Sequence, residues 1–139
     1  MKDQTTLKLR EIGLRVTPQR QAILKLLKGN RTHPSAENIY HEILKEYPGI
    51  SFATVYNTLS RLAEAGEIHE LDIDPNKKRF DPCLSPHSHF YCKVCKRIYD
   101  AGDDFPFPTE IQRAGRHRIE TIQINLKGVC RTCGEKRRG

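Results

Sequence analysis

A chain of 139 residues can form one domain or two small ones, and either half would have a thin core that benefits from a metal or a partner chain. Lysine and arginine outnumber the acids by 24 to 17, and the resulting charge of +7 is typical of nucleic-acid-binding proteins. The polar start, and the lack of any apolar run near the roughly 18 residues of a membrane span, favour a cytoplasmic protein whose cysteines bind metals rather than form disulfides.

Helix signals dominate the first half of the chain. Thr17 suits a helix N-cap because its hydroxyl can accept a backbone N–H, and Pro18 suits the first helical position. Ser51 has the same capping role before a later apolar stripe, and Pro48-Gly49 forces a tight turn ahead of it. Two amphipathic helices joined by such a turn form a helix-turn-helix. The predicted helices cover residues 3–13, 17–28, 35–47 and 51–65.

A hairpin is predicted after the last of these helices. Residues 68–73 alternate between apolar and polar side chains as a strand does, and residues 78–80 can pair back across a turn. A hairpin that follows a helix-turn-helix is a wing, and Pro82 and Pro86 mark a hinge beyond it. The predicted α+β fold therefore has a winged-helix DNA-binding domain at 1–80, a hinge with metal ligands at 81–88 and a small α/β domain at 89–139.

The helix at 51–65 is the predicted recognition helix. Its inner face should consist of apolar side chains, namely Phe52, Val55, Leu59 and Leu62. The polar side chains left outside could read base edges and phosphates. Two alternatives stay open, because Tyr56 could be a half-buried core aromatic and Arg61 a solvated charge. The predicted DNA contacts on this helix are Thr54, Tyr56, Asn57 and Arg61.

Basic residues outside the recognition helix should also contact DNA. Lys77, Lys78 and Arg79 at the wing tip suit phosphate contacts, which set the register of the protein on the duplex without reading sequence. Arg15, ahead of the second helix, could enter a minor groove or simply be exposed.

Two CxxC pairs in the second half predict a structural zinc site. Cys92 and Cys95 form one pair, and Cys130 and Cys133 form the other. Each pair turns two thiolates toward one point, and four thiolates suit tetrahedral zinc without a free position. The intervening residues exceed the usual spacing of a zinc ribbon, so a small insertion with a short helix at 109–114 is expected. A redox CxxC is the rival interpretation, but no thioredoxin-like unit is recognisable around either pair.

A second group of ligands is mixed in chemistry. His87 and His89 are two apart, so their rings should share one side of an extended strand. Asp81 and Asp100 offer hard oxygens, and a histidine–carboxylate set without thiolate favours Fe(II), Mn(II) or Co(II). His33 precedes a predicted helix, and it would bridge the two domains if it folded back onto the His87–His89 strand.

The order and spacing of these motifs resemble the ferric uptake regulator family over the whole chain. The resemblance rests on residues 13–20 (GLRVTPQR), 33–36 (HPSA), 53–56 (ATVY), 79–81 (RFD) and 87–89 (HSH), and on the two CxxC pairs. It implies a homodimeric, metal-responsive transcriptional repressor rather than an enzyme, with a dimerisation domain after the winged helix and a near-palindromic operator. The regulatory ligands that it implies are His33, Asp81, His87, His89 and Asp100.

The resemblance also suggests a branch of that family. Asp100 stands where iron-sensing members usually carry Glu, and Asp there, with Asn57, is similar to the peroxide-responsive repressors. In that branch Fe(II) reacts with hydrogen peroxide and a ligand histidine becomes 2-oxo-histidine, which by position implies His33 or His87. Such oxidation would spoil ligation and release DNA, whereas manganese in the same site would repress without reacting.

Several alternatives stay open at this point. Iron-responsive members often carry a further metal site, whose positions fall here on Pro86, Ser88, Phe107 and Ile122. None of these four residues is a usual metal ligand, so we expect only one regulatory site. An iron- or zinc-responsive uptake repressor without peroxide sensing remains possible, and the unexplained Cys83 keeps the zinc branch open. A metal-dependent hydrolase or thiol oxidoreductase would leave the wing without a role, and an architectural DNA binder would bind without regulatory metal.

Overall fold

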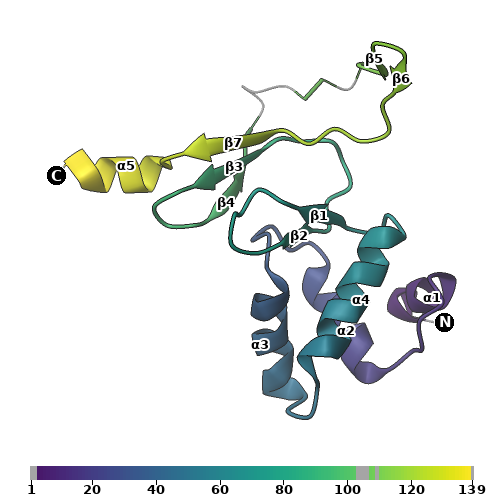
Figure 1. The fold of residues 1–139 in the computed structure, drawn as a ribbon. Coiled ribbons are helices and arrows are strands. Elements are labelled where there is room, and N and C mark those ends of the chain that lie inside the picture. Colours follow the sequence, from purple (N-terminus) through teal and green to yellow (C-terminus); the bar gives the residue numbers. More distant parts are fainter. Residues whose placement is uncertain (1–2, 103–106, 109, 139) are drawn as a thin grey trace. The chain divides into compact units, whose positions relative to one another are not determined.

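The computed structural model describes residues 3–102, 107–108 and 110–138. The chain forms two compact units, Met1–Leu84 and Ser85–Gly139 (Figure 1), and each is described by itself. The division falls within the segment predicted as a hinge. Along the described residues, no helix combines the length and the apolar character that crossing a membrane requires.

The first unit is a helical bundle followed by a hairpin. Its elements are α1 (Gln4–Glu11), α2 (Pro18–Leu27), α3 (Ala36–Glu46), α4 (Phe52–Glu64), β1 (His69–Leu71) and β2 (Arg79–Asp81). The apolar stripes of the helices meet in one core, where Leu9, Ile23, Ile39 and Leu59 are fully buried. Val55 and Leu62 lie inward as predicted, but the inward placement of Phe52 was wrong. Its side chain is 39% exposed and contacts the rings of Tyr40 and Tyr56 instead.

Side-chain caps fix where the helices of this unit begin. The hydroxyl of Thr17 accepts the backbone N–H of Arg20, and that of Ser51 accepts the backbone N–H of Thr54, which confirms both predicted caps. Ser35 forms a reciprocal capping box with Asn38: Ser35 Oγ accepts Asn38 N at 3.1 Å, and Asn38 Oδ1 accepts Ser35 N at 3.1 Å. The start of α3 is therefore held at both of these backbone donors.

Replacing Ser35 with alanine should destabilise the first unit by about 1 kcal/mol, because the backbone N–H of Asn38 loses the hydroxyl of the buried Ser35 as its acceptor. The measurement is urea denaturation of the zinc-loaded chain, followed by far-ultraviolet circular dichroism. Glu37 is exposed in the same first turn, so Glu37→Ala is a matched control that should leave the midpoint almost unchanged. An equal shift in both variants would contradict a capping role for Ser35.

The predicted wing is present as an antiparallel hairpin of β1 and β2, in which Glu70 pairs with Phe80. The prediction that Arg79 contacts phosphate was wrong. Arg79 is buried, its Nε donates to Asp74 Oδ2 at 3.0 Å, and its Nη1 donates to the carbonyl of His33 at 3.1 Å. Burial works to raise the pKa of Asp74, but hydrogen bonds from Asn76 and Arg79 outweigh it and leave that pKa below its usual value.

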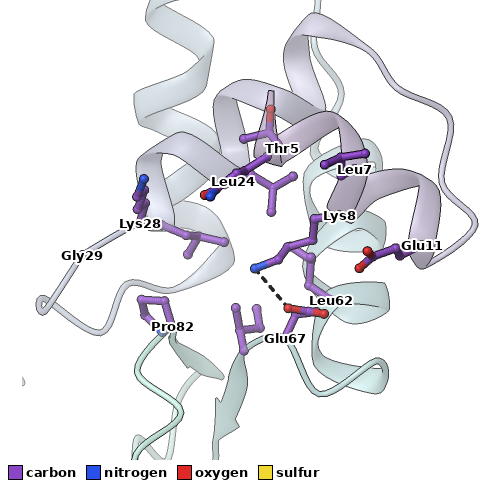
Figure 2. Close-up of a pocket in the computed structure, with 13 residues that line it drawn as sticks. Thr5, Leu7, Lys8, Glu11, Leu24, Lys28, Gly29, Leu62, Glu67 and Pro82 are labelled. Carbon is purple, nitrogen blue, oxygen red and sulfur yellow. Dashed lines mark ion pairs between the residues drawn. The ribbon is translucent and has the colours of Figure 1, made fainter. Parts of the chain in front are cut away.

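A pocket of about 500 Å³ opens beside α1 in the first unit (Figure 2). Leu24, Leu27 and Leu62 give it apolar walls, and an ion pair of 3.0 Å between Lys8 Nζ and Glu67 Oε2 lies within it. Both partners of that pair are partly exposed, so the pair contributes little stability. None of the residues predicted to bind metal or DNA lines this pocket.

The second unit is built on a small sheet. Its elements are β3 (His89–Cys92), β4 (Ile98–Asp100), β5 (Arg113–Ala114), β6 (His117–Arg118), β7 (Asn125–Gly128) and α5 (Arg131–Arg138). Strand β3 is central, antiparallel to β4 and parallel to β7, as Figure 1 shows. Its buried cluster contains Cys92, Cys130 and Cys133, with Phe90, Tyr99 and Val129 packed around them. The cysteine sulfurs therefore form the centre of this cluster, in the place that apolar side chains take in a larger domain.

The insertion between the CxxC pairs differs from the prediction. A helix was expected at 109–114, but Arg113–Ala114 is strand β5 and pairs with β6 across a turn at Gly115. Residue 109 itself lies outside the described residues. Gly115 has φ of +60°, a left-handed conformation that glycine adopts readily and that suits a tight hairpin turn. Gly115 therefore turns a hairpin where a helix had been expected.

Candidate metal centres and DNA-binding surface

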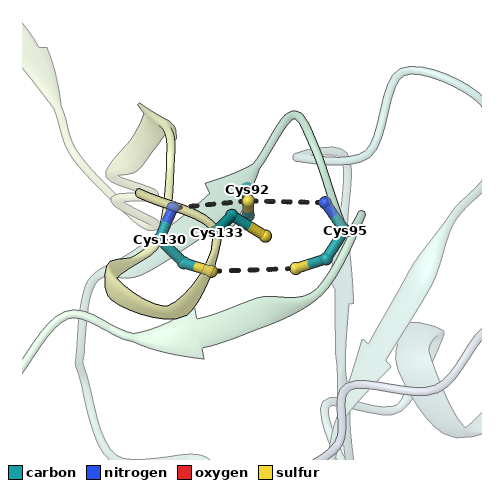
Figure 3. A group of neighbouring side chains, drawn as sticks. All are labelled: Cys92, Cys95, Cys130 and Cys133. Atoms are coloured by element: carbon teal, nitrogen blue, oxygen red, sulfur yellow. Dashed lines mark hydrogen bonds between the residues drawn. The ribbon is translucent and has the colours of Figure 1, made fainter. Parts of the chain in front are cut away.

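The four predicted zinc ligands meet in the second unit. Cys92 ends β3, Cys95 lies in the turn before β4, and Cys130 and Cys133 lie at the start of α5 (Figure 3). All four sulfur atoms lie within 4.8 Å of one another. Parallel pairing of β3 with β7 aligns Cys92 with Gly128 and so brings the two CxxC pairs to the same end of the sheet. Distant positions in the sequence thereby become one cluster.

Backbone amides point at the sulfur atoms of this cluster. Cys92 Sγ accepts the N–H of Cys130 at 3.3 Å and the N–H of Cys95 at 3.5 Å. Burial works to raise the pKa of the Cys92 thiol, but these N–H groups outweigh it and lower the pKa to about 6. Burial and the neighbouring sulfurs raise the pKa of Cys133 to about 12. A cation at the centre would hold all four groups as thiolates.

The donor set fits zinc. Four converging thiolates fill a tetrahedral shell, and the N–H groups around Cys92 supply the outer hydrogen bonds that such sites use. Zn²⁺ is thus the structural ion of the second unit. The C-terminal CxxC does stand at a helix N-terminus, but four clustered sulfurs distinguish it from an isolated redox pair.

The first unit brings together two of the predicted regulatory ligands. Nε2 of His33 lies 3.5 Å from Oδ2 of Asp81, and both side chains are buried. His33 has φ of +52°, a left-handed conformation that is uncommon for residues other than glycine. Strand β2 holds this segment in place, because Phe80 N donates to the carbonyl of Pro34 at 2.8 Å and Arg79 binds the carbonyl of His33. Surroundings of this kind maintain strained residues at functional sites.

The second unit brings together the other three. Nε2 of His87 lies 3.2 Å from Oδ1 of Asp100, and Nε2 of His89 lies 3.8 Å from the same oxygen. The two imidazole rings are 4.4 Å apart between centroids, as their spacing in the sequence predicted. His89 pairs directly with Asp100 across β3 and β4. Nδ1 of His87 lies 2.6 Å from the carbonyl of Ser85, a contact that suits an N–H there and makes Nε2, which faces Asp100, the nitrogen that could ligate a metal.

Both groups offer imidazole nitrogen and carboxylate oxygen without sulfur. That combination fits Fe(II) or Mn(II) as the regulatory ion. Cys83 is exposed, and its contribution near the site is a backbone N–H that donates to Asp81 Oδ1 at 2.9 Å. Ser88 is buried, and its Oγ has no hydrogen-bond partner among the described residues. It stands at one of the positions named above for a further metal site.

The predicted DNA contacts lie on the first unit. Tyr56 and Asn57 are exposed on α4, and Thr54 is partly exposed. Arg61 is partly buried, and its Nη2 donates to the carbonyl of Ile12 at 2.7 Å, so this guanidinium also ties α4 to the end of α1. Tyr56 is 41% exposed, so it is a surface residue and not the half-buried core aromatic that was the alternative.

Basic residues near the wing and ahead of α2 have separate surroundings. Lys77 is exposed in the turn of the wing, whereas Lys78 Nζ forms an ion pair of 2.9 Å with Glu70 Oε1. That partner raises the pKa of Lys78 above its ordinary value, so the side chain keeps its charge at neutral pH. Arg15 is exposed, and its carbonyl accepts a hydrogen bond from Arg20.

Two residues that matter to the sites were missed at the level of sequence. Arg79 positions His33, and alternation along the strand does not mark this role, because all three residues of β2 are buried. Tyr99 contacts the sulfur cluster, with its hydroxyl 3.6 Å from Cys130 Sγ and 3.9 Å from Cys95 Sγ. Hydrogen bonding to these sulfurs raises the pKa of Tyr99 to about 12. No sequence pattern marks this contact, because it depends on the parallel pairing of β3 with β7.

Known proteins match this arrangement. The family model of the ferric uptake regulator family matches residues 11–129. The peroxide-responsive repressor PerR of Staphylococcus aureus strain Mu50 is 36% identical over 138 residues, which cover 96% of this chain and 92% of that protein. The solved Campylobacter jejuni peroxide stress regulator is 32% identical with a TM-score of 0.69, covering 96% of this chain and 100% of that one.

A relative named for iron is similar as well. The Vibrio cholerae ferric uptake regulator (Fur) has a TM-score of 0.72 and 26% identity, over 90% of this chain and 98% of that one. The match of the family model spans most of the chain, including the helix-turn-helix, the wing and the histidine–carboxylate segment. On this basis the chain belongs to the ferric uptake regulator family.

Proposed function

We propose that the chain is a homodimeric repressor that binds its operator in a metal-dependent manner and responds to hydrogen peroxide. The observation that carries the proposal is the pairing of Asp100 with His87 and His89, in a chain that is 36% identical to a peroxide-responsive repressor along almost all of its length. Iron-responsive relatives of this family usually have Glu at that position. The role is regulatory rather than enzymatic, and it places the protein with DNA in the cytoplasm.

The regulatory ligand set that we propose combines both units. His33 and Asp81 from the first unit, and His87, His89 and Asp100 from the second, would share one Fe(II) or Mn(II). Support comes from the matching donor types and from the family's motif positions. A shared ion would favour one placement of the winged helix relative to the dimerisation domain, and ligands shift such equilibria only through differential affinity. Residues 81–88 would then act as the hinge between domains 1–80 and 89–139.

The DNA contacts follow from the exposed polar face of α4. Tyr56 and Asn57 would read base edges in the major groove, and Lys77 would contact phosphate from the wing. A dimer presents two such surfaces at a fixed spacing, so the operator should be near-palindromic. The full set of proposed contacts is Arg15, Thr54, Tyr56, Asn57, Arg61, Lys77 and Lys78.

The response to peroxide would use the histidine ligands themselves. A bound Fe(II) would supply the one-electron redox chemistry that activates hydrogen peroxide and would not be consumed overall, whereas Mn(II) would support repression without that reaction. His33 or His87 would be oxidised at a ring carbon and would provide the two electrons overall. One oxygen atom of the peroxide is added to the ring, and the other leaves as water. The imidazole carbonyl of 2-oxo-histidine alters the ring that donates to the metal. The ligand set then loosens, and the winged helices lose the spacing that the operator requires.

Replacing His33 tests the proposed bridge. His33→Asn removes the imidazole, yet asparagine tolerates the left-handed backbone found at this position. We expect affinity for Mn(II) to fall by more than the roughly 10- to 100-fold that loss of an outer-shell partner causes. Binding to an operator fragment, measured by fluorescence anisotropy during a Mn(II) titration, should weaken in parallel, while one zinc per chain is retained.

His117→Ala is the matched control, because His117 is exposed in β6 and belongs to neither predicted site. It should behave as the unchanged chain. Metal-dependent binding that survives intact in His33→Asn would contradict the bridge. Binding that does not depend on Mn(II) at all, after mild chelation, would instead support an architectural DNA binder.

A second candidate is an iron-responsive uptake repressor without peroxide sensing. The structural similarity to the V. cholerae protein favours it, since that protein is a ferric uptake regulator. The two candidates share the metal dependence of operator binding and differ in histidine oxidation, so peroxide treatment of the Fe(II) protein separates them.

A further inference from the structure

Tyr99 stands beside the sulfur cluster on β4. Successive residues of a strand face opposite sides, and the next residue, Asp100, lies against His87. The ring of Tyr99 instead packs on the cluster of Cys92, Cys130 and Cys133. Packing alone would be satisfied by phenylalanine or leucine, so the hydroxyl needs its own explanation.

The hydroxyl of Tyr99 reaches two of the four sulfurs. Tyr99 Oη lies 3.6 Å from Cys130 Sγ and 3.9 Å from Cys95 Sγ, both within the range of hydrogen bonds to sulfur. Thiolates that bind zinc carry no proton and can only accept, so the hydroxyl must donate. Hydrogen bonds from outer groups of this kind tune the ligands of a metal site.

Access to these sulfurs runs past Tyr99. A pocket of about 400 Å³ is lined by Tyr99, Phe90, Leu126, Val129 and Cys130, among others. A molecule as small as hydrogen peroxide can enter a space of this size and approach the Cys130 sulfur. Cys130 is buried but lines this pocket, and Cys95 is exposed, so each of the two sulfurs near Tyr99 can be reached by a small oxidant.

We propose that Tyr99 protects the zinc site against oxidation by donating its single O–H to the thiolate of Cys130, with that of Cys95 as the alternative acceptor. A thiolate attacks one oxygen of hydrogen peroxide, the O–O bond breaks, and a sulfenic acid and hydroxide form. A second thiolate then displaces hydroxide from that sulfur and makes a disulfide, so two electrons pass from sulfur to peroxide. The hydrogen bond stabilises the sulfur lone pair that begins this sequence. The role concerns the zinc site and is independent of whether the regulatory site senses peroxide.

The test compares two Tyr→Phe variants of the zinc-loaded chain. Y99F removes the donor and keeps the ring, and Y91F removes a buried hydroxyl on β3 that has no hydrogen-bond partner among the described residues. Under excess hydrogen peroxide, with a chromogenic zinc chelator, zinc should leave Y99F about three- to tenfold faster than the unchanged chain, because one hydrogen bond has this effect on a rate. Y91F should release zinc at the original rate.

A spectroscopic measurement separates tuning from support of the fold. In protein with Co(II) in place of zinc, removing a donor to thiolate should move the sulfur-to-cobalt charge-transfer band to longer wavelength in Y99F and leave it unmoved in Y91F. Equal zinc release and an unmoved band in Y99F would overturn the proposal. Loss of zinc from Y99F without oxidant would also overturn it, because the hydroxyl would then retain the metal rather than protect the sulfur.

Discussion

Cys92→Ser is expected to abolish zinc binding and to unfold residues 85–139, while the first unit keeps its fold. Zinc supplies roughly 10–16 kcal/mol of apparent binding free energy in small zinc domains, and whole domains are stable by only about 5–15 kcal/mol. Three of the four ligands are buried in one cluster, against which Phe90, Tyr99 and Val129 pack, so this packing would be lost without the ion. Cys92 also accepts the N–H groups that join the two CxxC pairs.

The experiment measures zinc per chain by mass spectrometry and backbone protection by hydrogen exchange. Amides of β3 and β7 should exchange rapidly in Cys92→Ser, and amides of α2 and α4 should stay protected, since the core of the first unit contains no sulfur. Cys83→Ser is the matched control, because Cys83 is exposed and outside the cluster. Full zinc content and native protection in Cys92→Ser would show that the second unit is held by other contacts.

Local rules were sufficient to predict the first unit. Thr17, Ser35 and Ser51 begin helices because their hydroxyls accept backbone N–H groups nearby, and such contacts need no knowledge of the distant chain. The wing hairpin is equally local. Phe52 was misplaced because helical periodicity assigns a face but not its limits, and Tyr40 and Tyr56 give this ring partners near the surface.

The second unit was less predictable because its decisive contacts are distant in sequence. Parallel pairing of β3 with β7 joins residues 36 positions apart, such as His89 and Asn125, and it sets where Tyr99 meets Cys130. The CxxC motifs still predicted the ligands, because a structural zinc site needs four donors and this requirement does not depend on the fold of the residues between the two motifs. The helix expected at 109–114 was wrong because the glycine that follows it, Gly115, could end a helix or turn a hairpin. Only the pairing of β5 with β6 decides between the two.

The buried contacts of His33 show the same limit. A histidine before a proline carries no pattern of its own, and its position depends on Arg79 and Phe80, which follow more than 40 residues later in strand β2. The resemblance to a family, rather than composition, identified it as a ligand. The structure adds the reason why this residue is rigid, which is that its carbonyl and that of Pro34 are both bound to the wing.

Treating the Fe(II) protein with stoichiometric hydrogen peroxide should add one oxygen atom to His33 or His87, and operator binding should be lost with the same time course. Peptide mass spectrometry after digestion locates the oxygen, and anisotropy of a labelled operator follows the release. Asp100→Glu tests the role of the carboxylate, which lies 3.2 Å from His87 Nε2. The added methylene displaces the carboxylate by more than 1 Å, and a misplacement of that size can lower a rate on the order of 100-fold. Histidine oxidation should therefore become slow in Asp100→Glu, while Mn(II)-dependent operator binding is retained.

Two controls decide how the result is understood. The Mn(II) protein should stay on its operator under the same peroxide treatment, and its histidines should gain no oxygen. His41→Ala should be oxidised as the unchanged chain is, because His41 is exposed on α3 and outside both ligand groups. An Fe(II) protein that keeps all its histidines unmodified and still binds its operator would identify an iron-responsive repressor, in which Asp100 sets metal affinity rather than reactivity.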